Sequence, residues 1–311
     1  MAASIIGSAA MTPSAGTNTG DHLTPELFMT LSRVSEMALS PDGKTAVYAV
    51  SFPDVKTNKA TRELFTVNLD GSGRKQITDT ESNEYAPAWM ADGKRIAFMS
   101  NEGGSMQLWV MNADGTERRQ LSNIEGGITG FLFSPDERQV LFTKDIKFGK
   151  RTKDIYPDLD KATGRIITDL MYKHWDEWVE TIPHPFIANA TDGMITTGKD
   201  IMEGEPYEAP MKPWSGIEDF SWSPDGQNIA SASRKKTGMA YSLSTNSDIY
   251  IYNLASGRTH NISEGMMGYD TYPKFSPDGK SIAWISMERD GYESDLKRLF
   301  VADLATGKRT H

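Results

Sequence analysis

"LSPDGKTAVY", residues 39–48, is the stretch that decides the fold. It combines an apolar anchor, a tight polar turn and an alternating apolar run. Proline presets φ at the second turn position, and the Asp-Gly pair supplies side-chain capping and a positive φ. The alternation that follows the turn predicts a β-strand.

The same pattern recurs along the chain, and a second pattern of strand, glycine-containing turn and strand follows it. This second pattern predicts a β-hairpin. Each unit therefore predicts four strands: one before the Pro-Asp-Gly turn, one after it, and the hairpin pair. The further turn copies are "WMADGKRIAF" from Trp89, "FSPDERQVLF" from Phe133, "WSPDGQNIAS" from Trp222 and "FSPDGKSIAW" from Phe275; the hairpin copies begin at Leu64, Leu108, Ile249 and Leu299, with a degraded copy from Pro185.

The spacing of the turn aspartates predicts an all-β fold, a β-propeller. Asp42, Asp92, Asp136, Asp225 and Asp278 follow one another at intervals of 50, 44, 89 and 53 residues. A period near 45–50 residues with four strands per unit is typical of propeller blades. The long interval contains one turn and one hairpin copy, which predicts one blade with an insertion at residues 144–182. We expect about five blades, near residues 34–78, 84–122, 128–200, 217–263 and 270–311, within a propeller domain over residues 21–311.

Two features precede the first blade. "LTPELFMTLSRV", from Leu23, predicts a short helix with Thr24 as its cap, whose Leu27, Phe28 and Leu31 would cover the propeller. Residues 1–20 are small, apolar and then low in complexity, and they offer Ser8-Ala9-Ala10 at the spacing that a signal peptidase reads. They predict either the remnant of a secretory signal or a flexible leader. The first interpretation implies a periplasmic or secreted protein.

Composition excludes several classes of function. The 311 residues carry a net charge of −9 with a pI of about 5.2, which argues against nucleic acid as a partner. There is no cysteine, and none of the five histidines shows a tight metal-ligand spacing. No apolar run reaches the ~18 residues of a membrane span. We therefore expect no metal, no cofactor and no membrane insertion.

Several stretches carry a resemblance to a known family. "YAPAWMADGKRIAFMSN" (residues 85–101) and "YPKFSPDGKSIAWIS" (residues 272–286) resemble the repeat shared by TolB-like periplasmic propellers and by the propeller domain of prolyl-oligopeptidase-family serine peptidases. "LTPELFMTLSRVSEMALSPDGK" (residues 23–44) resembles the entry helix and first blade of dipeptidyl-peptidase-5-type and acylaminoacyl-peptidase-type members. "YKHWDEWVE" (residues 172–180) resembles a segment of the dipeptidyl-peptidase-5 branch.

The resemblance implies a seven-bladed propeller followed by an α/β-hydrolase domain that holds the catalytic serine. Such an enzyme would release dipeptides from the free N-termini of oligopeptides, after alanine or an apolar residue. The chain lacks the Gly-x-Ser-x-Gly elbow of that domain, since the nearest match, Gly279 to Ala283, belongs to a repeat strand. We therefore expect no catalytic residue in this chain, a hydrolase domain absent from it, and no peptidase activity of the chain alone. A complete five-bladed propeller and a TolB-like protein-binding module are the alternatives.

The stretch "KHWDEWVE", residues 173–180, is the candidate substrate site, because the repeat does not explain it. If the stretch is extended, His174, Asp176 and Trp178 share one face, and Trp175 and Glu177 share the other.

The resemblance implies that acids from a propeller insertion hold the α-ammonium group of the peptide. Glu177 and Asp176 match that chemistry, and Trp175 or Trp178 would form a wall of the pocket. The alternative is a packing role for the tryptophans. Tyr156, Tyr172 and Tyr207 are weaker candidates. The expected partners are an oligopeptide substrate and the protein's own hydrolase domain, and uncovered blade faces are compatible with self-association.

Overall fold

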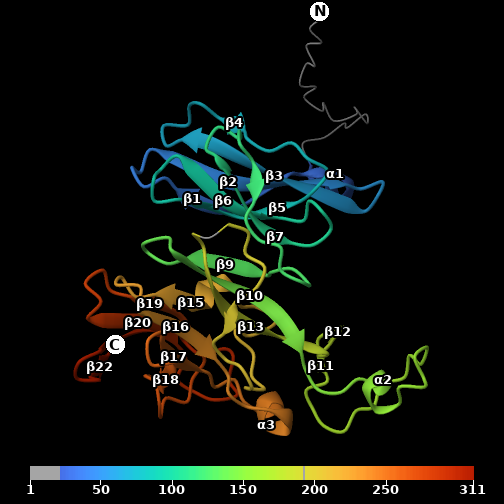
Figure 1. The fold of residues 1–311 in the computed structure, drawn as a ribbon, viewed down its shortest axis with the longest axis vertical. Helices are drawn as coiled ribbons and strands as arrows, with labels where there is room; N and C mark the ends of the chain where they lie inside the picture. Colours follow the sequence, from blue (N-terminus) through green and yellow to red (C-terminus); the bar gives the residue numbers. More distant parts are fainter. Residues whose placement is uncertain (1–21, 192) are drawn as a thin grey trace, which may run out of the picture.

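Five four-stranded antiparallel sheets confirm the predicted propeller. The computed structural model describes residues 22–191 and 193–311. In every sheet the four strands lie in the order in which they occur along the chain. Figure 1 shows the blades following one another from blue to red. The strands, blade by blade, are β1 (Arg33–Leu39), β2 (Thr45–Asp54), β3 (Lys59–Asn68) and β4 (Lys75–Gln76); β5 (Glu84–Trp89), β6 (Arg95–Ser100), β7 (Gln107–Asn112) and β8 (Arg119–Gln120); β9 (Gly130–Phe133), β10 (Gln139–Lys147), β13 (Thr181–Asn189) and β14 (Lys199–Asp200); β15 (Phe220–Trp222), β16 (Asn228–Ser233), β17 (Asp248–Asn253) and β18 (Arg258–Asn261); β19 (Asp270–Phe275), β20 (Ser281–Ser286), β21 (Arg298–Asp303) and β22 (Arg309–Thr310).

The remaining elements are short helices and one small hairpin. They are α1 (Pro25–Thr30), α2 (Thr152–Ile155), η1 (Ile217–Asp219), α3 (Gly238–Leu243), and the strands β11 (Lys173–His174) and β12 (Glu177–Trp178). The predicted start of α1 is confirmed, because the Thr24 hydroxyl accepts the N–H of Leu27 at 3.2 Å.

The expectation that α1 covers the propeller with its apolar side is wrong. Leu27, Phe28 and Leu31 are 38%, 49% and 44% exposed. The Arg33 guanidinium lies 5.4 Å from the centre of the Phe28 ring. The leader, residues 1–20, lies outside the described residues.

A serine-to-aspartate hydrogen bond holds the turn of four blades. The Ser40 hydroxyl donates to the Asp42 carboxylate at 2.7 Å and accepts the N–H of Thr45 at 3.0 Å. The hydroxyl also lowers the pKa of Asp42, so the carboxylate is ionised and accepts at neutral pH. The same donor and acceptor recur as Ser134–Asp136 at 2.7 Å, Ser223–Asp225 at 2.5 Å and Ser276–Asp278 at 2.6 Å.

The turns also touch from blade to blade. The Cδ of Pro224 lies 3.6 Å from the point where a Cβ on Gly279 would stand, so the proline packs against the glycine of the next blade's turn. Pro41 packs against Gly93 and Pro135 against Gly226 in the same arrangement. The contact between the second and third blades differs. There Ala91 replaces proline and so has a free N–H, and the Glu137 that replaces glycine accepts it through its carboxylate.

The core lies between the blades. Four clusters of buried apolar residues each join two consecutive blades. The largest fully buried side chain, Trp284 of β20, belongs to the cluster between the fourth and fifth blades. None of these clusters among the described residues joins the fifth blade to the first. This packing argues against a closed ring of five blades.

The third blade carries the insertion. β10 and β13 pair without interruption from Gln139–Asn189 to Lys147–Thr181. The insertion is therefore shorter than the predicted 144–182, because residues 144–147 and 181–182 remain in the sheet. Phe148 donates its backbone N–H to Glu180 at 3.0 Å and closes the base. Figure 1 shows the segment with α2 projecting from the side of the blades.

Ala91 and Glu137, which replace the proline and the glycine of the other turns, are predicted to be energetically coupled between the second and third blades. Ala91→Pro removes a donor that Glu137 uses, and Glu137→Gly removes the acceptor that Ala91 uses. The double variant restores the proline–glycine contact of the other turns. We expect it to be more stable, by about 1 kcal/mol, than the sum of the two single changes. Urea unfolding of the four proteins measures this coupling, and strict additivity would contradict the pairing.

A buried carboxylate predicts a pH-dependent stability. Asp270, at the start of β19, is fully buried, and burial raises its pKa to about 7 although the Ser286 and Ser263 hydroxyls oppose the shift. The unfolded chain ionises this group near its ordinary value of 3.8, so stability present at pH 4 is lost as the pH rises toward 7.

Asp270→Asn cannot ionise. Its stability relative to the parent should therefore increase between pH 4 and pH 8, by at most about 4 kcal/mol, and level off above pH 7. Urea unfolding at several pH values tests this, with the exposed Asp158→Asn as the control. A difference that does not change with pH would refute the account.

Candidate substrate pocket

One end of the propeller gathers the long connections. Strands of an antiparallel sheet alternate in direction, so the loops between the second and third strands leave the same end as the links between blades. A pocket of about 670 Å³ opens at this end. It is lined by the insertion, the link to the fourth blade, and the loops after β16, β18 and β20; its residues include Met171, His174, Trp175, Lys212, Pro213, Trp214, Ser215, Arg234, Tyr241, Thr245, Tyr269, Tyr272, Glu293 and Lys297.

The candidate stretch forms a tight hairpin over this pocket. β11 pairs with β12, with Lys173 opposite Trp178 and His174 opposite Glu177. Trp175 and Asp176 form the turn, and Trp175 has a positive φ of 52°. The condition that residues 174 to 178 are extended is therefore not met. The chain reverses at the turn, so simple alternation of faces does not describe these five residues.

Trp175 is the member of the predicted set that lines the pocket. Its ring meets the ring of Trp214 edge-on, with centroids 4.6 Å apart. The two residues are 72% and 69% exposed. Two large aromatic side chains that are so open beside a pocket are typical of a binding surface.

Trp178 has a different environment. Its ring lies 6.0 Å from that of Tyr172, and the Arg165 and Lys173 cations lie over it at 4.3 and 4.9 Å. These cations already occupy the ring surface. Trp178 does not line the pocket, and its contacts hold the insertion together.

Asp176 and Glu177 are exposed carboxylates beside Trp175. Neither forms an ion pair with another of the described residues. Other acids of the insertion are engaged: Asp154 pairs with Lys147 at 2.7 Å, and Glu180 pairs with Arg165 at 3.0 Å. The hairpin beside the pocket therefore carries two carboxylates that are free to bind a cation, and neither is among the residues that line the pocket.

A buried cluster anchors the hairpin. The Glu208 side chain is 4% exposed, accepts a hydrogen bond from the Tyr241 hydroxyl, and lies 3.7 Å from His174 Nε2. Burial raises the pKa of Tyr241, and the Glu208 charge adds to the shift. The hydroxyl therefore stays protonated and donates.

Sequence reasoning missed Glu208, Tyr241 and Trp214. The sequence does contain a signal for Glu208 and Trp214. Both lie in "PYEAPMKPWSG", residues 206–216, a proline-rich link that no repeat explains.

The weaker candidates lie elsewhere. Tyr156 is 51% exposed within the insertion, and Tyr207 lines a small hollow beside the main pocket. His184 is fully buried in β13 and pairs with Asp200 at 2.9 Å. This pair ties β13 to the end of its own sheet, and neither residue lines the main pocket.

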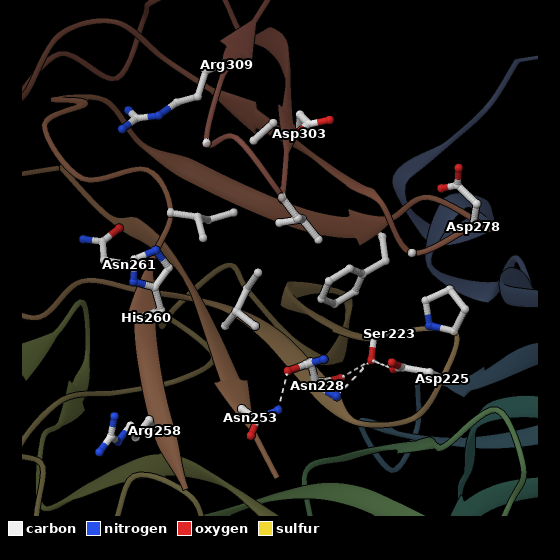
Figure 2. Close-up of a pocket in the computed structure, with 18 of the residues that line it drawn as sticks. Ser223, Asp225, Asn228, Asn253, Arg258, His260, Asn261, Asp278, Asp303 and Arg309 are labelled. Atoms are coloured by element: carbon white, nitrogen blue, oxygen red, sulfur yellow. Dashed lines mark hydrogen bonds between the residues drawn. The ribbon is translucent and has the colours of Figure 1, made fainter. Parts of the chain in front are cut away.

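A second pocket, of about 710 Å³, lies between the outer strands of the fourth and fifth blades. Figure 2 shows Asp225, Asp278 and Asp303 along one side and Arg258, His260 and Arg309 along the other. The three aspartates accept hydrogen bonds within their own turns. These acids serve the fold, so the pocket offers fewer free groups than its lining suggests.

Residues 22–191 and 193–311 hold no group of three or more histidine, aspartate or glutamate side chains placed to bind a metal ion. None of their helices has the length and apolar character needed to cross a membrane.

Known proteins share this fold and sequence. A family model described as TolB beta propeller domain matches residues 31–177. The chain is 99% identical over its full length to dipeptidyl-peptidase 5 of Porphyromonas gingivalis and covers 46% of that protein. It is 56% identical to dipeptidyl-peptidase 5 of Porphyromonas endodontalis, over 93% of this chain and 42% of that protein. It thus spans less than half the length of these relatives and matches their N-terminal part.

A solved structure supports the fold. Uncomplexed acylaminoacyl peptidase of Pyrococcus horikoshii aligns with a TM-score of 0.62 and 18% identity, covering 89% of this chain and 39% of that one. At this identity the likeness shows the propeller fold alone.

Proposed function

We propose that this chain, which matches the N-terminal part of the dipeptidyl-peptidase 5 proteins, is the propeller portion of a serine peptidase that releases dipeptides from oligopeptide N-termini. The 99% identity to such a protein supports the activity, and the coverage of 46% supports a further, catalytic domain. In this proposal the propeller admits short peptides and holds their N-terminus, and an α/β-hydrolase domain supplies the serine. The chain alone has no peptidase activity.

The observation that carries the proposal is a pair of carboxylates with no ion-pair partner among the described residues, on the hairpin whose Trp175 lines the pocket. A dipeptidyl peptidase must hold a free α-ammonium group at a fixed distance from its nucleophile. Asp176 and Glu177 form no ion pair with another residue of the described ranges, and they adjoin Trp175, whose ring lines the pocket. A carboxylate pairs with the ammonium group, and the neighbouring indole ring adds cation–π attraction.

The buried cluster below the hairpin gives these acids a defined position. His174 lies edge-on to the Tyr241 ring at 5.7 Å and next to the Glu208 carboxylate. The cluster ties the hairpin to α3 of the fourth blade, so the turn cannot move freely away from the pocket. Glu208 is the second candidate for the anchor, but its carboxylate already accepts from Tyr241 and from the backbone of Lys212.

Three finer features belong to the same proposal. The apolar and aromatic lining supports cleavage after alanine or an apolar residue. The apolar leader, residues 1–20, supports export to the periplasm or beyond. Val34, Met37 and Leu39 of β1 are 69%, 71% and 51% exposed, which supports self-association through the open face of the first blade.

The alternative is a TolB-like module that binds a partner protein and catalyses nothing. The match to the TolB propeller domain is compatible with it. The identity to two dipeptidyl-peptidase 5 proteins favours the peptidase. Reading the gene beyond His311 separates the two: a Gly-x-Ser-x-Gly motif supports the peptidase, and an immediate stop codon rules it out.

The amine anchor predicts a selective loss of activity. In the full-length enzyme, Asp176→Asn combined with Glu177→Gln should lower kcat/KM for a peptide with a free N-terminus at least tenfold, because the ammonium group loses its counter-charge. Hydrolysis of the N-acetylated peptide should change less than twofold. The control is Asp160→Asn, an exposed acid of the same insertion.

Two outcomes would count against this anchor. Equal losses on the free and acetylated peptides would point to a role in folding. An intact double variant beside a Glu208→Gln variant that loses the free peptide selectively would move the anchor to the buried acid.

A further inference from the structure

Arg234 is a cation held between two aromatic rings on the wall of the substrate pocket. It follows the end of β16 in the connection to β17, and its side chain is half-buried. The Cζ atom lies 4.7 Å from the centre of the Tyr241 ring and 5.9 Å from that of Tyr269. Stacking of this kind fixes the plane of a guanidinium group and leaves its edge available for hydrogen bonds.

This guanidinium lacks an anionic partner. Within the described part of the chain no carboxylate lies within ion-pair distance of Arg234, and its buried Nε has no hydrogen-bond acceptor. The two rings do not supply the charge, because burial raises the pKa of both Tyr241 and Tyr269 and keeps the hydroxyls neutral. A half-buried cation without a counter-charge is costly and is relieved by an anion.

The other charges of the pocket leave Arg234 as the group best placed for such an anion. Lys212 is paired with Asp145 at 3.4 Å. Lys297 and Glu293 are exposed, where solvent screens them. The lining of the pocket is therefore positive at Arg234, and the hairpin beside the pocket carries the negative charges of Asp176 and Glu177.

We propose that Arg234 binds a carboxylate of the peptide. This inference rests on the proposed function, since it requires that the pocket takes peptides. The planar fork of a guanidinium matches the two oxygens of a carboxylate, and the full negative charge satisfies the cation better than a peptide carbonyl does. The carboxylate is either the C-terminus of a short peptide or an aspartate or glutamate side chain. The first source gives a preference for short peptides and the second a preference for acidic sequences.

The test compares peptides that differ in one charged group each. Isothermal titration measures binding of Ala-Phe-Ala-Ala to the full chain as the free acid and as the C-terminal amide. We expect the acid to bind about tenfold more tightly, which is the effect of one charge-assisted pair. A second pair, Ala-Phe-Glu-Ala amide and Ala-Phe-Gln-Ala amide, tests a side-chain carboxylate when the C-terminal carboxylate is blocked. If the glutamate peptide binds more tightly than the glutamine peptide, side-chain carboxylates bind as well.

Variants assign the effect to the residue. In Arg234→Gln the acid and the amide should bind within twofold of each other. Arg234→Lys keeps the charge but not the fork, so part of the preference remains. Arg258→Gln, in the second pocket, is the matched control and should preserve the tenfold ratio. If circular dichroism shows that Arg234→Gln does not fold, the acid-to-amide affinity ratios of Arg234→Lys and of the parent protein still test the inference.

The two proposals fail in different ways. Equal binding of acid and amide by the parent chain, or no binding of either at millimolar concentration, overturns the inference. A preference that disappears in Lys297→Gln and survives in Arg234→Gln also overturns it. The N-acetylated acid tests the proposed function separately: unchanged affinity on acetylation removes the amine anchor and leaves the carboxylate site standing.

Discussion

The hydrogen bond from a serine hydroxyl to the aspartate two residues later holds the turn between the first and second strands in four of the five blades. It lowers the pKa of the aspartate and fixes the direction in which the second strand leaves. The proline between the two residues then lies against the glycine of the next blade's turn. One local interaction therefore sets the geometry within a blade and the distance between blades. The buried clusters form between blades because the turns bring consecutive sheets together at this spacing.

The exception to this pattern shows the same constraint. At the second and third turns, the proline and the glycine are both replaced, and a carboxylate of one blade accepts the N–H that proline would lack. The contact between blades is kept by different chemistry. The third blade carries a long insertion between β10 and β13. These two strands stay paired up to residues 147 and 181, where the insertion begins and ends. The rigid ends give the hairpin over the pocket a defined place although it belongs to no sheet of the propeller.

Sequence reasoning predicted the propeller, the helix cap and the location of the unusual stretch, because each depends on local spacing and turn chemistry. It failed where the chain reverses over two residues, since the turn at Trp175 and Asp176 contains no glycine or proline to announce it. It treated Trp175 and Trp178 alike, whereas one ring lines the pocket and the other is covered by cations. It also missed Arg234, which lies near Tyr269 of the next connection, and Glu208, which accepts from Tyr241 of a different loop. Such contacts between distant segments leave no periodic signal in a single sequence.

The central claim is that the end of the propeller with the insertion receives the peptide. Hydrogen–deuterium exchange of the full chain, with and without saturating Ala-Phe-Ala-Ala, tests it most directly. The account predicts slower exchange in residues 171–175, 212–215 and 241–245, which contribute to the pocket lining from separate connections. Protection confined to β18 and β22, beside the second pocket, would contradict it.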